Sequence, residues 1–185
     1  MGPEVSILLP VYNAEQTLET CLRSLLRQRM NAWECVLVDD GARDRSLELA
    51  RGFAARDDRI RVVAVEHRGL VASLNLGLER CRAAVVARMD ADDWMHRDRL
   101  ATQLRALTVE PKLAAVGTHV RMFPREAGVW QREATATERA LPGESSQTRK
   151  GRGGYEAWLN SIISADDVAR EAFVECPIAH PTLMI

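Results

Sequence analysis

Short apolar runs alternate with amphipathic segments over the first two thirds of the chain. The runs are rich in Val, Ile and Leu and predict buried strands, because strands of a buried parallel sheet are apolar on both faces. The five expected strands are Val5–Leu9, Cys35–Val38, Arg61–Val65, Ala84–Ala87 and Leu113–Val116. Strands that alternate with helices form βαβ units, so the pattern predicts an α/β fold with a mainly parallel central sheet flanked by helices.

The segments between these strands repeat apolar residues at helical spacing. The expected stripes run over Leu18–Leu26, Leu47–Ala54, Val71–Cys81 and Leu100–Leu107. Asn13 with Gln16 three residues later is typical of a helix start. Asp44 is expected to cap the second helix and Asp93 the fourth.

The regular alternation stops after Val120. Residues 133–154 are polar and rich in Gly, Ser and Thr, which predicts a mobile loop or insertion. A helix is expected to follow, with Tyr155, Trp158, Leu159, Ile162 and Ile163 on its core stripe. A shorter helix is expected near Asp166, with Val168, Ala172 and Phe173 facing inward. Pro181–Ile185 looks like the interior of a strand, so residues 1–185 are expected to form one domain that is incomplete at its C-terminal end.

Composition narrows the classes of partner and compartment. Lys and Arg total 25 against 26 for Asp and Glu, a net charge of -1, which gives no basis for nucleic acid as the main partner. No apolar run reaches the ~18 residues that a transmembrane segment needs, and no signal peptide is evident. The four cysteines are dispersed and predict reduced thiols. A cytoplasmic protein is expected, and peripheral association with the inner face of the membrane is compatible with these features.

Polar residues follow several of the expected strands. They are Tyr12 and Asn13 after the first, Asp39 and Asp40 after the second, and Asp90, Asp92 and Asp93 after the fourth. Ligands of open parallel sheets bind beyond the carboxyl ends of the strands. The chain has neither a Gly-x-Gly-x-x-Gly nor a Gly-Lys-Ser/Thr loop to hold phosphates. A diphosphate bound here would therefore need a divalent cation, Mg²⁺ or Mn²⁺, on the carboxylates.

Three segments resemble, in order and spacing, the motifs of the family 2 glycosyltransferases, inverting enzymes of the Rossmann-like GT-A fold. They are Val5–Ala14, Val38–Gly41 and Met89–Trp94, and Pro177–Thr182 resembles a later stretch of some members. The resemblance implies transfer of a sugar from a nucleotide-diphosphate sugar, with a UDP-sugar favoured. It implies a glycan, a lipid-linked or another hydroxyl acceptor, in cell-envelope or polysaccharide synthesis.

The resemblance also implies roles for individual residues. Those expected to bind the nucleotide sugar are Pro10, Val11, Tyr12, Asn13, Asp39, Asp40, Asn75, Arg88, Asp90 and Ala91. Tyr12 would pack on the base, Asp40 would accept N3–H of uracil, Asp39 would support the ribose or the loop, and Asp90 would hold ribose hydroxyls. Asp92 would be the metal ligand.

Simpler structural interpretations exist for several of these residues. Tyr12–Asn13 could belong to a helix cap, and Asp39–Asp40 could be turn residues before a glycine. His180 is expected to be structural, and His67 and His96 have no partner at zinc-binding spacing. Tyr155 and Trp158 fit a core stripe better than a sugar platform.

Two departures from the family pattern matter. Leu74 stands where many members carry Arg; we expect Arg88, on the same strand face as Asp90, to compensate by holding the nucleotide or orienting Asp90. No catalytic base motif follows Asp93, so the general base is expected beyond Ile185. The alternative hypothesis is a nucleotide-sugar-binding module without transfer activity of its own. A nucleotidyltransferase and a phosphatase are disfavoured because their characteristic loops and motifs are missing.

Overall fold

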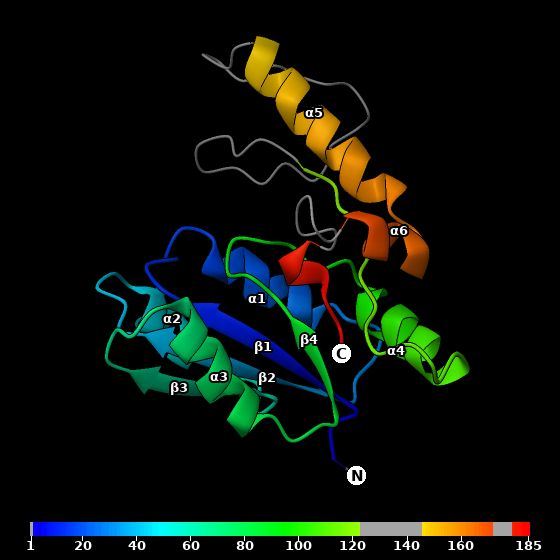
Figure 1. Ribbon diagram of the computed structural model, residues 1–185. Coiled ribbons are helices and arrows are strands. Elements are labelled where there is room, and N and C mark those ends of the chain that lie inside the picture. Colours follow the sequence, from blue (N-terminus) through cyan, green and yellow to red (C-terminus); the bar gives the residue numbers. More distant parts are fainter. Residues whose placement is uncertain (1, 123–145, 172–178) are drawn as a thin grey trace. The chain divides into compact units, whose positions relative to one another are not determined.

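The computed structural model describes residues 2–122, 146–171 and 179–185 (Figure 1). The chain forms two compact units. The larger one comprises Met1–Thr118 together with His180–Ile185, and the smaller one comprises His119–Ala179.

The larger unit is built on a four-stranded sheet. Its strands are β1 (Val5–Val11), β2 (Trp33–Asp40), β3 (Ile60–Val65) and β4 (Val85–Arg88), in the order β3-β2-β1-β4. All three neighbouring pairs are parallel. Four of the predicted strands and the parallel α/β class are therefore confirmed.

The predicted fifth strand, Leu113–Val116, is wrong: only Val116 pairs, in an antiparallel bridge to Met184. An apolar run does not reveal whether a partner strand lies beside it, and Leu113 is exposed. The strand expected at Pro181–Ile185 is right only in its last part. His180–Thr182 form a single 3₁₀ turn, whereas Leu183–Ile185 exchange backbone hydrogen bonds with β4.

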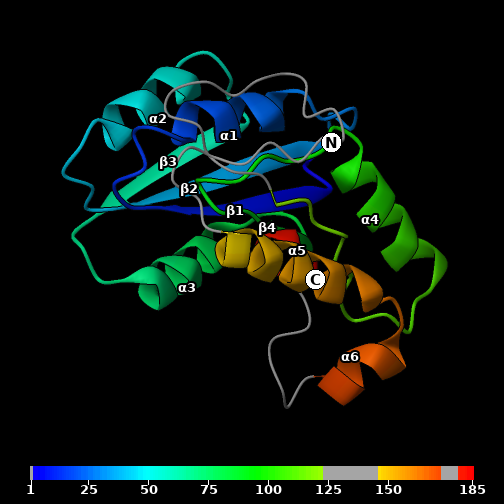
Figure 2. The same ribbon diagram turned by 90° about the horizontal axis from the view of Figure 1, so that it is seen from above.

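Four helices accompany this sheet, as predicted. They are α1 (Leu18–Leu26), α2 (Ser46–Ala54), α3 (Leu70–Arg80) and α4 (Arg99–Val109). Figure 2 shows α1 and α2 over one face of the sheet and α3 over the other. The α1 side of the sheet holds the main core, made by Ile7, Leu9, Leu22, Leu25, Cys35 and Leu37. On the other side, α3 lies close to the sheet at Gly77, where an added Cβ would collide with Leu8.

The helix α3 faces the sheet with different residues from those predicted. Val71 and Leu78, expected in its buried stripe, are 71% and 47% exposed, while Ser73 and Gly77 are buried. Small residues let the helix backbone approach the sheet. Because Ser73 and Gly77 carry no large apolar side chain, the buried face of α3 did not form an apolar stripe in the sequence.

None of the three residues predicted to start a helix is the observed N-cap. α1 begins at Leu18, and Asn13 instead adopts a left-handed conformation with φ 49° in the preceding loop. α4 begins at Arg99 after Asp98, so Asp93 does not cap it. The N-cap of α2 is Arg45, so Asp44 lies one residue before the cap position; its Oδ1 accepts the amide hydrogen of Ser46, the first residue of α2.

The buried carboxylate of Glu34 connects three strands near their amino ends. It accepts hydrogen bonds from the Ser6 hydroxyl in β1, from Arg61 in β3 and from the Arg82 amide before β4. Burial raises the pKa of Glu34, but these donors outweigh burial and hold it below its ordinary value. The network stabilises the register of the sheet at the edge opposite the strand ends that carry the motifs.

The smaller unit contains α5 (Ser146–Ser161) and α6 (Ala165–Glu171). The loop predicted for residues 133–154 is wrong over 146–154, which are helical; residues 123–145 lie outside the described residues. Lys and Arg are good helix formers, and the helix expected from Tyr155 onward extends back through them. The helix near Asp166 is confirmed, with Asp167 and Ser164 exchanging hydrogen bonds at its start.

The predicted stripe of α5 is right in part. Leu159 is buried, but Tyr155 is 38% exposed and stacks on Trp158 with 5.6 Å between ring centroids. Val168 is partly buried in α6, and the other expected stripe residues, Ala172 and Phe173, lie outside the described residues. None of the described helices combines the length and the apolar character that a membrane span requires.

Candidate functional site

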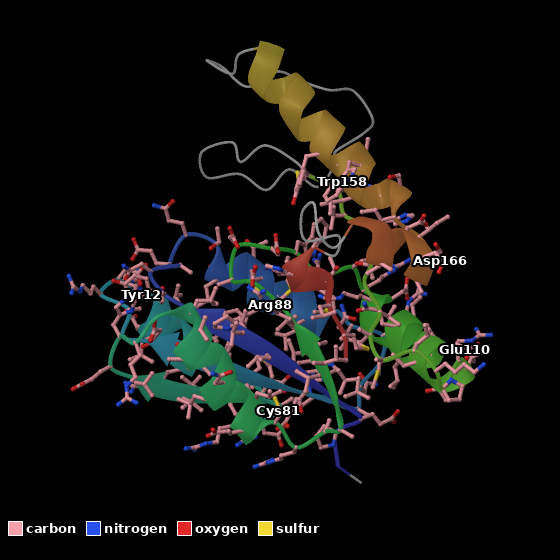
Figure 3. The ribbon with its side chains drawn as sticks, viewed as in Figure 1. Tyr12, Cys81, Arg88, Glu110, Trp158 and Asp166 are labelled. Carbon is pink, nitrogen blue, oxygen red and sulfur yellow. The ribbon has the colours of Figure 1, made fainter. Side chains whose placement is uncertain are left out.

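The motif residues of β1, β2 and β4 gather at one edge of the sheet. Because these strands are parallel and adjacent, their carboxyl ends lead into Tyr12, Asp40 and Asp90 on the same side. Figure 3 labels Tyr12 after β1 and Arg88 at the end of β4. The edge has two parts, a small pocket beside β1 and β2 and an acidic loop after β4.

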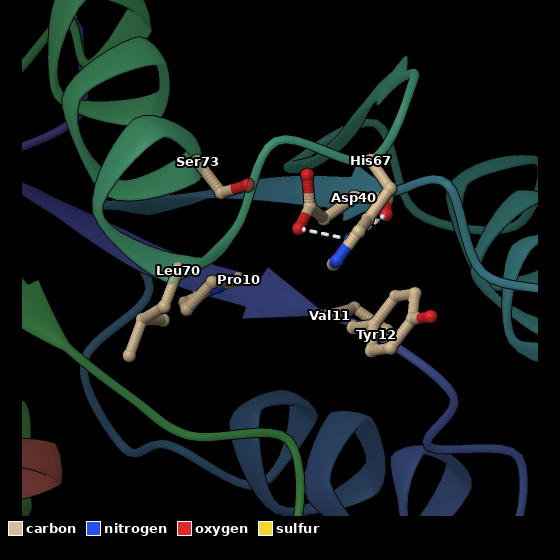
Figure 4. A pocket seen from close by; sticks show the side chains of 7 residues that line it. All are labelled: Pro10, Val11, Tyr12, Asp40, His67, Leu70 and Ser73. Carbon is tan, nitrogen blue, oxygen red and sulfur yellow. Dashed lines mark hydrogen bonds and ion pairs between the residues drawn. The ribbon is translucent and has the colours of Figure 1, made fainter.

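The pocket has a volume of about 170 Å³ (Figure 4). Its lining consists of Pro10, Val11, Tyr12, Asp40, His67, Leu70 and Ser73. Small-molecule sites are typically ~300–1,000 Å³ in volume, so this pocket suits one ring of a ligand. Four of the predicted site residues, Pro10, Val11, Tyr12 and Asp40, thus come together. His67, Leu70 and Ser73 were missed, although His67 follows the third strand and the strand-end rule would have found it.

Asp40 is a buried carboxylate at the inner side of this pocket. Its Oδ1 accepts the Arg68 amide at 2.8 Å and its Oδ2 the Gly69 amide at 2.9 Å. Burial raises the pKa of Asp40, but these hydrogen bonds hold it below its ordinary value. Asp40 is therefore ionised at neutral pH and is a hydrogen-bond acceptor.

Two aromatic rings form the outer part of the pocket. Tyr12, 42% exposed, stacks on His67 with 4.3 Å between centroids and 25° between planes. The Nδ1 of His67 lies 2.8 Å from Oδ2 of Asp40 and 3.1 Å from its carbonyl oxygen. Both partners are acceptors, so Nδ1 carries a proton.

A glycine makes this arrangement sterically feasible. Gly41 has φ +69°, and a Cβ there would lie 2.7 Å from the backbone nitrogen of His67. The Gly41 turn can pass next to the backbone of His67 only because it has no side chain. The glycine after Asp39–Asp40 therefore has a defined structural role.

Asn13 and Asp39 contribute to the loops around the pocket. The Asn13 carboxamide oxygen accepts the Arg43 amide at 2.8 Å, which ties the loop after β1 to the loop after β2. Asp39 is buried, and burial raises its pKa although the Ala42 and Gly41 amides donate to it. Its Oδ1 has no hydrogen-bond partner within the described ranges. In this conformation both residues act on the loops.

The acidic loop after β4 carries Asp90, Asp92 and Asp93. As expected from the strand geometry, Arg88 contacts Asp90, with 3.0 Å between Nη2 and Oδ1. Burial, then repulsion by Asp92 and Asp90, raises the pKa of Asp93 to about 6. Asp92 is exposed. Crowded carboxylates of this kind bind a cation favourably, because a cation removes their mutual repulsion.

No group of three or more His, Cys, Asp or Glu residues forms a metal cage within the described part of the chain. The loop nevertheless fits a cation of the Mg²⁺ or Mn²⁺ type, which usually takes one or two carboxylates and completes its shell with phosphate oxygens and water. The exposed position of Asp92 agrees with that mode of binding.

The remaining predicted residues lie elsewhere. Asn75 is exposed on α3 and is not part of the pocket lining. Ala91 has its methyl group in the main core, so only its backbone is available to a ligand. The expected roles of both residues stay predictions.

The parallel sheet, the flanking helices and the acidic loop after β4 are those of the Rossmann-like GT-A fold. The chain belongs to the family described as "Glycosyl transferase family 2", whose sequence profile matches residues 6–167. The resemblance stated from the motifs is therefore confirmed.

Two relatives illustrate the similarity. A putative glycosyltransferase EpsH from Bacillus subtilis is 40% identical over 111 residues, which are 60% of this chain and 32% of EpsH. The amylovoran biosynthesis glycosyltransferase AmsE from Erwinia amylovora is 40% identical over 121 residues, 64% of this chain and 46% of AmsE. The similar region thus spans less than half of either relative.

A solved structure shows the same fold. The mannosyltransferase PcManGT from Pyrobaculum calidifontis, in complex with GDP-Man and Mn²⁺, aligns with a TM-score of 0.58 at 28% identity. The alignment covers 65% of this chain and 36% of PcManGT.

Proposed function

We propose that this chain is the donor-binding part of an inverting glycosyltransferase that uses a nucleotide-diphosphate sugar, with a UDP-sugar favoured. The observation that carries the proposal is the convergence of Tyr12 and Asp40 in one pocket at the sheet edge that also bears the acidic loop. The nucleotide-sugar complex of PcManGT, a structure of the same fold, supports it.

The base is expected in the pocket. The Tyr12 ring offers a stacking surface, and the ionised Asp40 accepts a ring N–H, as N3–H of uracil provides. Thymine presents the same N–H, and the guanine of the PcManGT ligand presents an equivalent donor, so the base must be tested directly.

The diphosphate is expected at the acidic loop. Asp92 would ligate Mn²⁺ or Mg²⁺, Asp90 would hold ribose hydroxyls, and Arg88 would orient Asp90 through the contact described above. A divalent ion bound there supplies Lewis acidity, which stabilises negative charge on a departing nucleoside diphosphate. The Mn²⁺ in the PcManGT complex supports a divalent ion of this type.

We further propose that the acceptor is a glycan or a lipid-linked sugar in polysaccharide synthesis. The support comes from relatives such as AmsE, whose name refers to amylovoran biosynthesis. An acceptor carried by a lipid would bring the protein to the inner face of the membrane.

Calorimetric titration with UDP, dTDP and GDP, each with and without Mn²⁺, tests the proposal. In the presence of Mn²⁺, we expect UDP to bind more tightly than dTDP or GDP. Without Mn²⁺, we expect UDP to bind only weakly. The variant Asp92→Asn should lose most of the metal dependence, and Tyr12→Ala should weaken binding by about 1–3 kcal/mol through lost stacking. Asp58→Asn, at an exposed position, is the matched control. No binding of any of the three nucleotides would refute the proposal.

Transfer activity is tested separately, with radiolabelled UDP-sugars and oligosaccharide acceptors. Nucleotide binding without any transfer would favour the alternative, a nucleotide-sugar-binding module. Transfer with inversion at the anomeric carbon would support the full proposal.

A further inference from the structure

The ring of His67 is in the place where a base would reach Asp40. The Asp40 side chain is only 4% exposed, and both of its oxygens accept hydrogen bonds within the protein. Oδ1 accepts the Arg68 amide, while Oδ2 is shared between the Gly69 amide and His67. A base that donates a hydrogen bond to Oδ2 must therefore displace His67, because backbone amides have less freedom to move.

The stacking distance leads to the same conclusion. Carbon atoms of stacked rings approach to about 3.5–4 Å, so a base inserted between two rings must separate them by roughly that thickness again. The centroids of Tyr12 and His67 are only 4.3 Å apart. A base cannot fit between them in this conformation.

We propose that His67 occupies the stacking place of the nucleobase on Tyr12 and is displaced when the nucleotide binds, so that protonation of His67 weakens nucleotide binding. The proposal rests on the proposed function, since it takes the pocket to be the base site. His67 is half-exposed, with 51% of its side chain accessible, and can rotate outward without disturbing the core.

The charge of His67 affects nucleotide binding through the contact between His67 and Asp40. Neutral His67 donates a hydrogen bond from Nδ1 to Asp40, and protonation at Nε2 turns this bond into an ion pair. The groups that contact the ring are Asp40 and Tyr12, and its chain neighbours Glu66 and Arg68 are also charged. An ion pair at a half-exposed position contributes up to ~1 kcal/mol, so the expected penalty on nucleotide affinity is roughly threefold to fivefold.

Calorimetry with UDP and Mn²⁺ at pH 8.0 and pH 5.5 tests this on the chain and on His67→Ala. The phosphate groups of UDP and the acidic loop are present in both experiments. The change in Kd with pH in the unsubstituted chain, divided by that in His67→Ala, therefore gives the contribution of His67. We expect Kd to rise between pH 8.0 and 5.5 by about threefold to fivefold more in the unsubstituted chain than in His67→Ala. His96→Ala, which removes another exposed histidine, should behave like the unsubstituted chain.

A second measurement follows the ring directly. In the free protein, the C2–H resonance of His67, assigned by its loss in His67→Ala, should show the shielding of a ring stacked on Tyr12. Saturating UDP with Mg²⁺, which is diamagnetic, should change this resonance and leave that of His96 in place.

The outcomes separate the two proposals. Equal pH effects in both proteins, or an unchanged His67 resonance with UDP bound, would overturn the displacement of His67 and leave the base site intact. The base would then pack on the outer face of Tyr12. Absence of UDP binding at either pH, in both proteins, would instead refute the proposed function and this inference with it.

Discussion

Replacing Asp93 by Asn should stabilise the folded chain at neutral pH. Burial, together with repulsion by Asp92 and Asp90, raises the pKa of Asp93 from 3.8 to about 6. The folded chain therefore holds this proton more tightly than the unfolded chain does. Stability falls as the pH rises from about 3.8 to about 6, and the full cost of ionisation is present above pH 6.

The magnitude follows from the shift. The difference between 3.8 and about 6 is about two pH units, and one unit corresponds to ~1.4 kcal/mol, which gives a limit of about 3 kcal/mol. Asp93 is partly exposed, so solvent screening reduces the expected gain of Asp93→Asn to about 1–2 kcal/mol at pH 7.5. At pH 4.0 the gain should approach zero, because the carboxyl group is then protonated in the folded chain.

Urea denaturation at pH 7.5 and pH 4.0, without divalent cations, measures both values. Asp58→Asn makes the same chemical change at an exposed position and should alter the free energy of unfolding by less than ~0.5 kcal/mol at either pH. A loss of stability in Asp93→Asn at pH 7.5 would show that the ionised Asp93 gains more from its surroundings than burial and repulsion cost. An equal gain at both pH values would show that ionisation is not the cause.

Three further substitutions have defined outcomes. Gly41→Ala should lower the free energy of unfolding by about 1–3 kcal/mol, because both the φ of +69° and the nearby backbone of His67 disfavour a Cβ. Chemical denaturation measures this change, and unchanged stability would contradict the prediction. Arg88→Ala should weaken UDP binding about tenfold by releasing Asp90, and unaltered affinity in calorimetry would remove that role. Glu34→Gln should cost about 1–3 kcal/mol at pH 7 and less as the pH falls through the lowered pKa of the native carboxyl group; a cost that does not change with pH would contradict a charge effect.

The elements of the larger unit were predictable because their signals are local. Val, Ile and Leu runs such as Val5–Leu9 need no partner to be recognised, and the spacing of leucines between Leu18 and Leu26 is that of one helix face. The errors arose where the outcome depends on distant residues. Among the described residues, Leu113–Val116 has a β partner only at Val116, and α3 packs through Gly77, which carries no apolar side chain.

The candidate site shows the same division. Tyr12 and Asp40 were predicted to meet because parallel strands bring their carboxyl ends to one edge, and they line one pocket. The helix start assigned to Asn13 was wrong, because its carboxamide bonds the Arg43 amide, a partner 30 positions away. From the sequence, His67 was considered only as a possible zinc ligand. Its position in the pocket was therefore not predicted.

Sequence alone indicated the family, through its motifs, and the edge of the sheet that carries the site, because parallel strands bring their carboxyl ends to one edge. The tertiary structure decided how the polar groups at that edge are used. It placed His67 on both Tyr12 and Asp40, and it crowded Asp93 against its acidic neighbours. Hydrogen bonds and charge repulsion act over a few ångströms in space, and such proximities between distant residues exist only once the strands have assembled.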